Sequence, residues 1–140
     1  SHWDAALKKA DPTPAEQLKA LVAADFDRKI STRRKLAAWC AFWGEAKSRP
    51  TYKALCGAQD KRYQVTLQSI VEALKLEAGY GYDSAALTLA MCAMLEGLWF
   101  RLMMDDGLTR EMAHASATSF LASVFTKHFA ETAPTQERPN

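Results

Sequence analysis

The segment from Ser84 to Asp106 constrains the fold more than any other part of the chain, because a helix over it is apolar on two opposite sides. At about 100° per residue, one side carries the stripe Leu87, Met91, Leu95, Leu98 and Leu102. The other side carries Ala86, Leu89, Ala90, Ala93, Gly97 and Phe100. A helix that is apolar all round is buried all round. In a chain of 140 residues, one face can pack on its own domain, and we expect the other to pack on a second subunit.

The rest of the chain also has helical periodicity, whereas β-branched residues are few and no alternation of polar and apolar residues persists. We expect helices over residues 3–10, from Pro14, from residue 31 or 32 to Ser48, from Thr51 to about Ala78, from about Ser84 to Asp106, and from Thr109 to near Phe129. The sequence therefore predicts an all-α bundle of five or six helices.

The composition is that of one globular domain, with 49% hydrophobic residues, 24% charged residues and a formal net charge of +2. Nothing in it demands a nucleic acid or a membrane as a partner. Three cysteines, Cys40, Cys56 and Cys92, stand in helix-like contexts without a CxxC motif, which favours reduced thiols and a cytoplasmic protein.

The last two helices are the expected dimer surface. The final one is rich in alanine and serine, and small residues let another helix approach closely. We expect these helices to form a four-helix bundle about a two-fold axis between two subunits. The expected interface residues are Leu89, Ala93, Phe100, Ala113, Ala117, Phe120 and Val124. The alternative is a monomer whose central helix is wrapped by its own neighbours.

The stretch WCAFW places Trp39, Phe42 and Trp43 on one face of a helix. Such an aromatic stripe forms either ordinary core or one side of a binding pocket. Tyr63 lies on the apolar face of the next helix, where the polar Thr66 interrupts the stripe. Polar residues within an apolar stripe are typical of a pocket lining.

Two carboxylates, Asp25 and Glu96, fall on apolar helix faces. A carboxylate there costs several kcal/mol unless it is paired or hydrogen-bonded. Either an arginine or a tyrosine satisfies each of them within the core, or one or both face a cavity and meet a cationic or hydrogen-bonding ligand.

Catalytic motifs are weak. Glu111 and His114 have the spacing of half a di-iron site, which needs a second copy and further glutamates. No HExxH, GxSxG, Walker loop or GxGxxG is present. We expect no catalytic residue, metal site or cofactor, and a metal-dependent helical enzyme using Glu111 and His114 is the remaining enzymatic alternative.

Four stretches occur in an order that carries a resemblance: WCAFW, the helix start Pro50-Thr51-Tyr52, QDKRY and LEGLWFRLMMDD. Together they resemble the C-terminal domain of TetR-family transcriptional regulators, specifically the BetI-like group, over roughly residues 14 to 130. The most specific elements are W-x-x-F-W and the run from Glu96 to Arg101, an acid followed by G-L-W-x-R.

The resemblance implies a sensor and dimerisation module of a bacterial repressor. Residues 1–10 would be the end of a connecting helix, residues 11–130 the effector-binding and dimerisation domain, and residues 131–140 a disordered tail. The helix-turn-helix domain with which such regulators begin would be absent from this chain. Binding of a small molecule would relieve DNA binding by that head.

The group's link to choline implies a ligand that aromatic faces and a carboxylate can hold. The ligand-binding residues expected on this basis are Asp25, Trp39, Phe42, Trp43, Tyr63, Glu96 and Trp99. The partners would be a second copy and choline or another cationic or amphipathic metabolite, in an enclosed pocket of about 300–1,000 Å³. The alternative function is a helical interaction module with no small-molecule ligand.

Overall fold

The computed structural model describes residues 2–29, 32–46 and 50–129, and of residues 33, 46 and 50–60 the backbone alone. Within this part of the chain it contains helices and no strand: α1 (His2–Lys9), α2 (Pro14–Asp25), α3 (Arg33–Ala46), α4 (Pro50–Ala78), α5 (Ser84–Met104) and α6 (Arg110–Val124). The all-α fold predicted from the sequence is confirmed. The expected tail at 131–140 lies outside the described residues.

Three helices begin at residues that either accept a hydrogen bond from a free backbone N–H group or, as proline, have no N–H group. The Asp83 carboxylate accepts a hydrogen bond from the N–H of Ala86 at 2.8 Å, and α5 begins there. The Thr109 hydroxyl accepts from the N–H of Met112 at 3.1 Å at the start of α6. Pro14 opens α2, where a missing N–H has no cost.

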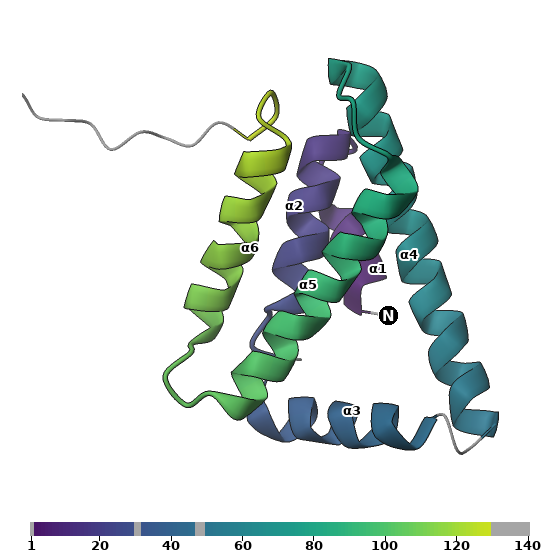
Figure 1. The fold of residues 1–140 in the computed structure, drawn as a ribbon, viewed down its shortest axis with the longest axis vertical. Coiled ribbons are helices and arrows are strands. Elements are labelled where there is room, and N and C mark those ends of the chain that lie inside the picture. Colours follow the sequence, from purple (N-terminus) through teal and green to yellow (C-terminus); the bar gives the residue numbers. More distant parts are fainter. Residues whose placement is uncertain (1, 30–31, 47–49, 130–140) are drawn as a thin grey trace, which may run out of the picture.

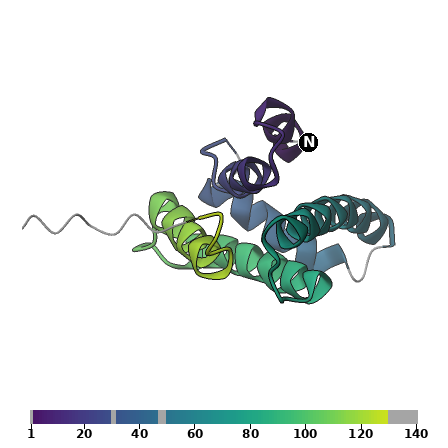
Figure 2. The ribbon, with the colours of Figure 1, turned by 90° about the horizontal axis from the view of Figure 1, so that it is seen from above.

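The helices form a bundle that is closed at one end by a crossing helix. In Figure 1, α3 lies crosswise below α2, α4 and α5. Seen along the bundle in Figure 2, α5 and α6 lie on one side, α1 lies on the opposite side and α2 lies between them. The α4 helix packs on α2, α3 and α5, while α6 packs on α2 and α5. The N-terminal segment α1 packs on α2.

The core gathers one stripe from each of the long helices. Fully or nearly fully buried side chains are Leu18, Leu21 and Val22 from α2, Leu36 from α3, Leu67, Val71 and Leu74 from α4, Met91, Leu95 and Leu102 from α5, and Leu121 from α6. Cys40 is half-buried and Cys92 is buried, and the side chain of Cys56 lies outside the described residues.

The last helix ends earlier than the sequence predicts. It stops at Val124 rather than near Phe129, because the backbone N–H of Lys127 donates to the Tyr80 hydroxyl at 3.0 Å instead of continuing the helical ladder. Phe129 still turns inward and is buried, as is Phe125. Beyond the helix, the N–H groups of His128 and Phe129 both donate to the Phe125 carbonyl at 2.9 Å, so a separate turn follows α6.

The outer face of α5 is exposed in the single chain. Leu89 is 67% exposed, Phe100 is 52% exposed and Ala93 is also exposed. By length and composition alone α5 is apolar enough to cross a membrane, but the core helix of a water-soluble protein passes the same test, and the stripe of Met91, Leu95 and Leu102 lies in the core. The apolar character of α5 is therefore no sign of a membrane span.

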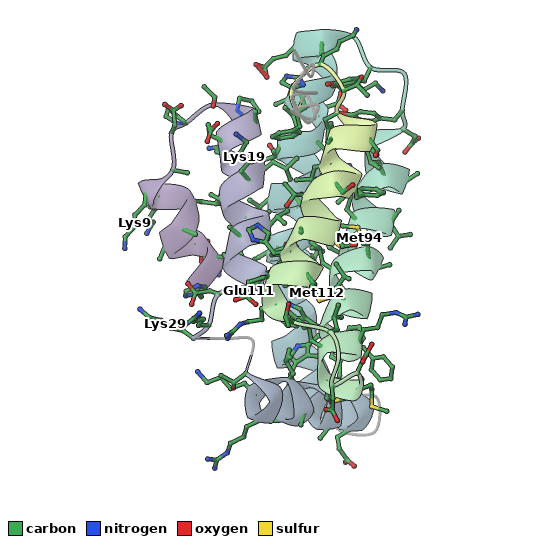
Figure 3. All side chains as sticks on the ribbon, turned by 90° about the vertical axis from the view of Figure 1, so that its left-hand side faces the viewer. Lys9, Lys19, Lys29, Met94, Glu111 and Met112 are labelled. Carbon is green, nitrogen blue, oxygen red and sulfur yellow. The ribbon has the colours of Figure 1, made fainter. Side chains whose placement is uncertain are left out.

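Two residues of the expected dimer surface face inward. Ala113 and Ala117 are 0% exposed, on the side of α6 that meets α2 and α5. Their small side chains let α6 approach its own neighbours closely, so they have no surface left for a partner. Phe120 and Val124 are half-buried. Figure 3 looks onto α6 and shows Met112, which is exposed, where that helix begins.

Two leucines of α4 provide a test of this core. Leu74 is 0% exposed and Leu76 is 76% exposed. We expect Leu74→Ala to lower the free energy of unfolding by about 2–5 kcal/mol, because it removes buried methyl groups and leaves a cavity. Leu76→Ala should change it by less than about 0.5 kcal/mol. Urea denaturation followed by circular dichroism measures both, and equal effects would contradict the packing.

Candidate functional site

The main candidate site is a cavity of about 160 Å³ lined by side chains from five helices. Its aromatic lining consists of Trp3, Trp39, Tyr63 and Trp99, and its acidic lining consists of Asp25 and Glu96. Gln64, Cys92 and Leu95 complete it. A cavity of about 150 Å³ accommodates a benzene molecule, so this one fits a compact group of similar size.

Asp25 is the last residue of α2 and is fixed there by two other helices. Its backbone carbonyl, which a helix end leaves without a partner, accepts a hydrogen bond from Trp99 Nε1 at 2.8 Å. Its carboxyl Oδ2 accepts from the Tyr63 hydroxyl at 2.7 Å. The side chain thus reaches the cavity at a point that α4 and α5 both determine.

Burial dominates the electrostatics of this pair. Asp25 is 8% exposed, and the loss of hydration raises the pKa of its carboxyl from 3.8 to about 7, although the Tyr63 hydrogen bond acts in the opposite direction. Burial, followed by the neighbouring Asp25, also raises the pKa of the Tyr63 hydroxyl, which stays protonated and remains the donor. Near neutral pH the cavity therefore contains a carboxyl group that a nearby cation could ionise.

The aromatic rings around the cavity form two groups, within each of which the rings contact one another. Trp39 stacks on Trp43 with centroids 4.8 Å apart and planes 24° apart, and it meets Trp99 edge-on at 5.0 Å and 80°. Trp3 meets Tyr63 edge-on at 5.6 Å and 89°. These contacts hold the rings of α1, α3, α4 and α5 in fixed relative orientations.

The structure brings five of the seven predicted ligand-binding residues together. Asp25, Trp39, Tyr63, Glu96 and Trp99 all line the cavity. Whether they bind a ligand stays a prediction, but their convergence on one point, which spacing alone could not show, is a property of the fold.

Two predicted residues lie elsewhere. Trp43 supports the far face of Trp39, is 41% exposed and lines a separate groove. Phe42 is half-buried and is not part of the cavity lining. Of the WCAFW stripe, only Trp39 lines the cavity, and the side chains of Phe42 and Trp43 do not.

Sequence reasoning missed four lining residues. Cys92 and Leu95 share a helix face with Glu96 and Trp99, at spacings of three and four residues, and this pattern could have identified them. Gln64 directly follows Tyr63. Trp3 belongs to α1, outside the continuous run of cavity helices, and no local signal links it to the others.

The cavity, at about 160 Å³, is smaller than the expected 300–1,000 Å³. A neighbouring hollow of about 300 Å³ shares Trp3, Asp25, Trp39 and Trp99 with it, and also has His2 and Lys35 in its lining. The titratable groups around Asp25 are thus Tyr63, Cys92 and Glu96 on one side and His2 and Lys35 on the other.

The alternative metal site finds no geometric support in the described part of the chain. His114 stacks on Phe26 with centroids 5.8 Å apart, beside Glu111 in a groove that Arg28 and Arg110 also line. Among the described residues no group of three or more histidine, cysteine, aspartate or glutamate side chains is placed to hold a metal ion. The position of His114 is explained by its packing on Phe26.

The comparisons with known proteins agree with the all-α fold. A family model described as "BetI-type transcriptional repressor, C-terminal" matches residues 14–126, which is most of the chain. The chain belongs to this family. It is thus a domain of a TetR-family, BetI-like transcriptional regulator. Regulators of the TetR family typically dimerise and bind a ligand and DNA, and they are not enzymes.

The BetI-type domain is similar to named regulators. It is 25% identical over 119 residues to the HTH-type transcriptional regulator BetI 2 of Chromohalobacter salexigens, covering 84% of this chain and 56% of that protein. It is 28% identical over 128 residues to BetI of Escherichia coli, covering 84% and 61%. The chain therefore spans about three fifths of these relatives.

A solved structure supports the fold of the BetI-type domain. A candidate transcriptional regulator from Pseudomonas aeruginosa PAO1 superposes with a TM-score of 0.80 at 20% identity, over 91% of this chain and 64% of that one. The matched family segment, residues 14–126, contains every cavity-lining residue given above except Trp3. In this domain, α1 therefore adds a wall to a cavity that is otherwise built within the family segment.

The buried carboxyl of the BetI-type domain predicts a pH-dependent stability difference. Because the folded pKa of Asp25 lies above its ordinary value, the stability it supplies is complete below about pH 4 and is lost as pH rises through about 7. Asn keeps the acceptor for Tyr63 and cannot ionise. We expect Asp25→Asn to become more stable than the wild type across this window, by roughly 4 kcal/mol at its upper end.

Denaturation of both proteins at a series of pH values measures this difference. The control is Asp27→Asn: the pKa of half-buried Asp27 is lowered, mainly by a hydrogen bond from the N–H of Lys29. Its stabilising effect should disappear as pH falls, which is the opposite sign. A pH-independent difference for Asp25→Asn would contradict the burial effect.

Proposed function

We propose that the chain is the effector-binding and dimerisation domain of a BetI-like repressor, and that its effector is a small cation such as choline. One observation carries the proposal: a single cavity is lined by three indoles, one phenol and two carboxyl groups. Effector binding would relieve DNA binding by the helix-turn-helix that the names of the longer relatives describe.

The cavity chemistry supports a cation that lacks conventional hydrogen-bond donors. Each aromatic face in contact with a cation contributes about 0.5–2 kcal/mol, most when water is excluded. Trp3, Trp39 and Trp99 provide indole rings, and no described residue lining the cavity is basic. A quaternary ammonium head is also close in size to the benzene-sized group that such a volume admits.

The raised pKa of Asp25 also supports a cationic ligand. An uncharged ligand would leave its buried carboxyl protonated, whereas a cation favours the ionised form. Binding of a cation would therefore release a proton at a pH below about 7, and the ion pair would replace the lost hydration of both groups.

Choline binding tests the site. We expect choline to raise the melting temperature and to bind more tightly as pH rises, by up to about tenfold per pH unit below 7, because Asp25 must lose its proton. Asp25→Asn should remove this pH dependence and weaken binding roughly tenfold to hundredfold. Isothermal titration calorimetry in buffers of different ionisation enthalpy measures affinity and proton release together.

The matched control ligand is the uncharged analogue in which carbon replaces the choline nitrogen. It should bind weakly and without pH dependence. Equal binding of the charged and uncharged compounds would exclude cation recognition, and no response to either would favour an interaction module without a choline-like ligand.

The outer faces of α5 and α6 support dimerisation. Leu89, Ala93 and Phe100 on α5 and Met112 on α6 are exposed apolar residues on neighbouring helices, and half-buried Phe120 and Val124 continue the surface. Pairing of this surface with its own copy would be isologous, as in most homodimers. Ala113 and Ala117, being fully buried, are not part of the proposed interface.

A pair of leucines tests the dimer. We expect Leu89→Glu to weaken dimerisation roughly hundredfold, since a charge is desolvated at an apolar interface. Leu76→Glu, at a leucine of α4 that is more exposed than Leu89, should leave it unchanged. Sedimentation equilibrium over a range of concentrations measures both. A wild-type chain that stays monomeric, or a dimer insensitive to Leu89→Glu, would contradict the proposed surface.

A further inference from the structure

Gln64 is the exposed residue of the cavity lining. It stands on α4 directly after Tyr63, and its side chain is exposed, whereas the other lining residues are buried or half-buried. The cavity therefore meets solvent at Gln64, while Asp25, which is 8% exposed, belongs to its buried part. A small ligand that holds its charge near Asp25 would thus have its other end toward Gln64.

The hydrogen-bonding groups of the cavity are not equally available to a ligand. The Tyr63 hydroxyl donates to Asp25 Oδ2 at 2.7 Å, and Trp99 Nε1 donates to the Asp25 backbone carbonyl at 2.8 Å. Within the described part of the chain, the side-chain amide of Gln64 has no hydrogen-bond partner. Gln64 thus has both donors and an acceptor that a ligand can use without breaking a bond of the fold.

The amide of Gln64 suits a neutral oxygen rather than the charge of the ligand. A primary amide both donates and accepts hydrogen bonds, as a hydroxyl group does, whereas the methyl groups of a quaternary ammonium have no conventional donor or acceptor. The cation is suited instead by the aromatic faces of Trp39 and Trp99 and by the acidic lining, Asp25 and Glu96. The lining thus combines groups for a charge with one polar group at the opening.

We propose that Gln64 is a specificity-determining residue of the effector site, which binds a neutral oxygen, such as a hydroxyl group, on a short arm of the cation. The inference rests on the proposed effector function and narrows its ligand class to hydroxyalkyl ammonium ions. The arm is short because a cavity of about 160 Å³ holds only a compact group. A carboxylate arm fits less well, since Asp25 and Glu96 line the same cavity and no described lining residue is basic.

The carboxylates of the cavity are the competing partners for the hydroxyl group of such a ligand. An ionised carboxylate only accepts hydrogen bonds, so Asp25 or Glu96 can bind a hydroxyl group but not an ether oxygen. The amide of Gln64 also donates, so it can bind both kinds of oxygen. Choline and its methyl ether therefore distinguish the amide from the carboxylates.

The experiment compares the affinity of this chain for choline and for propyltrimethylammonium, in which a methyl group replaces the hydroxyl group, by isothermal titration calorimetry. We expect the wild type to prefer choline roughly threefold to tenfold, and to keep part of this preference for the methyl ether over butyltrimethylammonium. Gln64→Met keeps the length of the side chain without its amide, so both preferences should disappear. Gln68→Met, the same exchange at an exposed position of α4 outside the lining, should keep them.

The outcomes separate the inference from the proposed function. Equal binding of choline and propyltrimethylammonium by the wild type overturns the role of Gln64 and leaves the cation cavity standing. A preference that persists in Gln64→Met, or that the methyl ether lacks altogether, assigns the hydroxyl group to a carboxylate and also overturns the inference. So does an equal loss in Gln64→Met and Gln68→Met, which would be an effect on α4 as a whole. If no ammonium ion binds, the proposed function and the inference both fail.

Discussion

The attachment of the end of α2 to two other helices is the interaction on which the rest of the structure depends. At Asp25 the backbone carbonyl accepts from Trp99 of α5, and the carboxyl accepts from Tyr63 of α4. The end of a helix leaves carbonyl groups without helical partners, and a buried carboxyl group has lost its hydration. Each of the two bonds therefore gives one of these groups a hydrogen-bond partner. The bonds also bring the lining of the cavity together, because Tyr63 and Trp99 reach it from two different helices, α4 and α5.

The two faces of α5 place the proposed effector site close to the proposed dimer surface. One face of this helix joins the core through Met91 and Leu95, and the outer face exposes Leu89 and Phe100. Glu96 lies where these two environments meet, in the lining of both the cavity and the separate groove that Trp43 lines. An effector contacting this carboxylate would therefore touch the same helix that the proposed partner covers, so that ligand and partner binding would be energetically linked.

The sequence predicted the helices well, because caps and apolar stripes are local and Asp83 or Thr109 acts within one turn. It also identified Asp25 as a carboxylate on an apolar face. It could not separate the inner from the outer surface of α6: small residues such as Ala117 pack closely inside a chain as readily as between chains. It likewise could not remove Phe42 from the cavity or add Trp3, since both depend on how α1 and α3 cross the other helices.

The placement of Trp3 gives α1 a direct part in the site. Its indole lines the cavity and meets Tyr63, while the following residue, Asp4, forms an ion pair with Arg62 at 3.0 Å. The ion pair lies at the surface and contributes little by itself, so the position of α1 depends mainly on the aromatic contact and on α2. A ligand pressing on Trp3 would act directly on α1, which packs on α2. A coupling of about 1–3 kcal/mol between the cavity and whatever precedes α1 in longer relatives would then require only a small change in the packing of one ring.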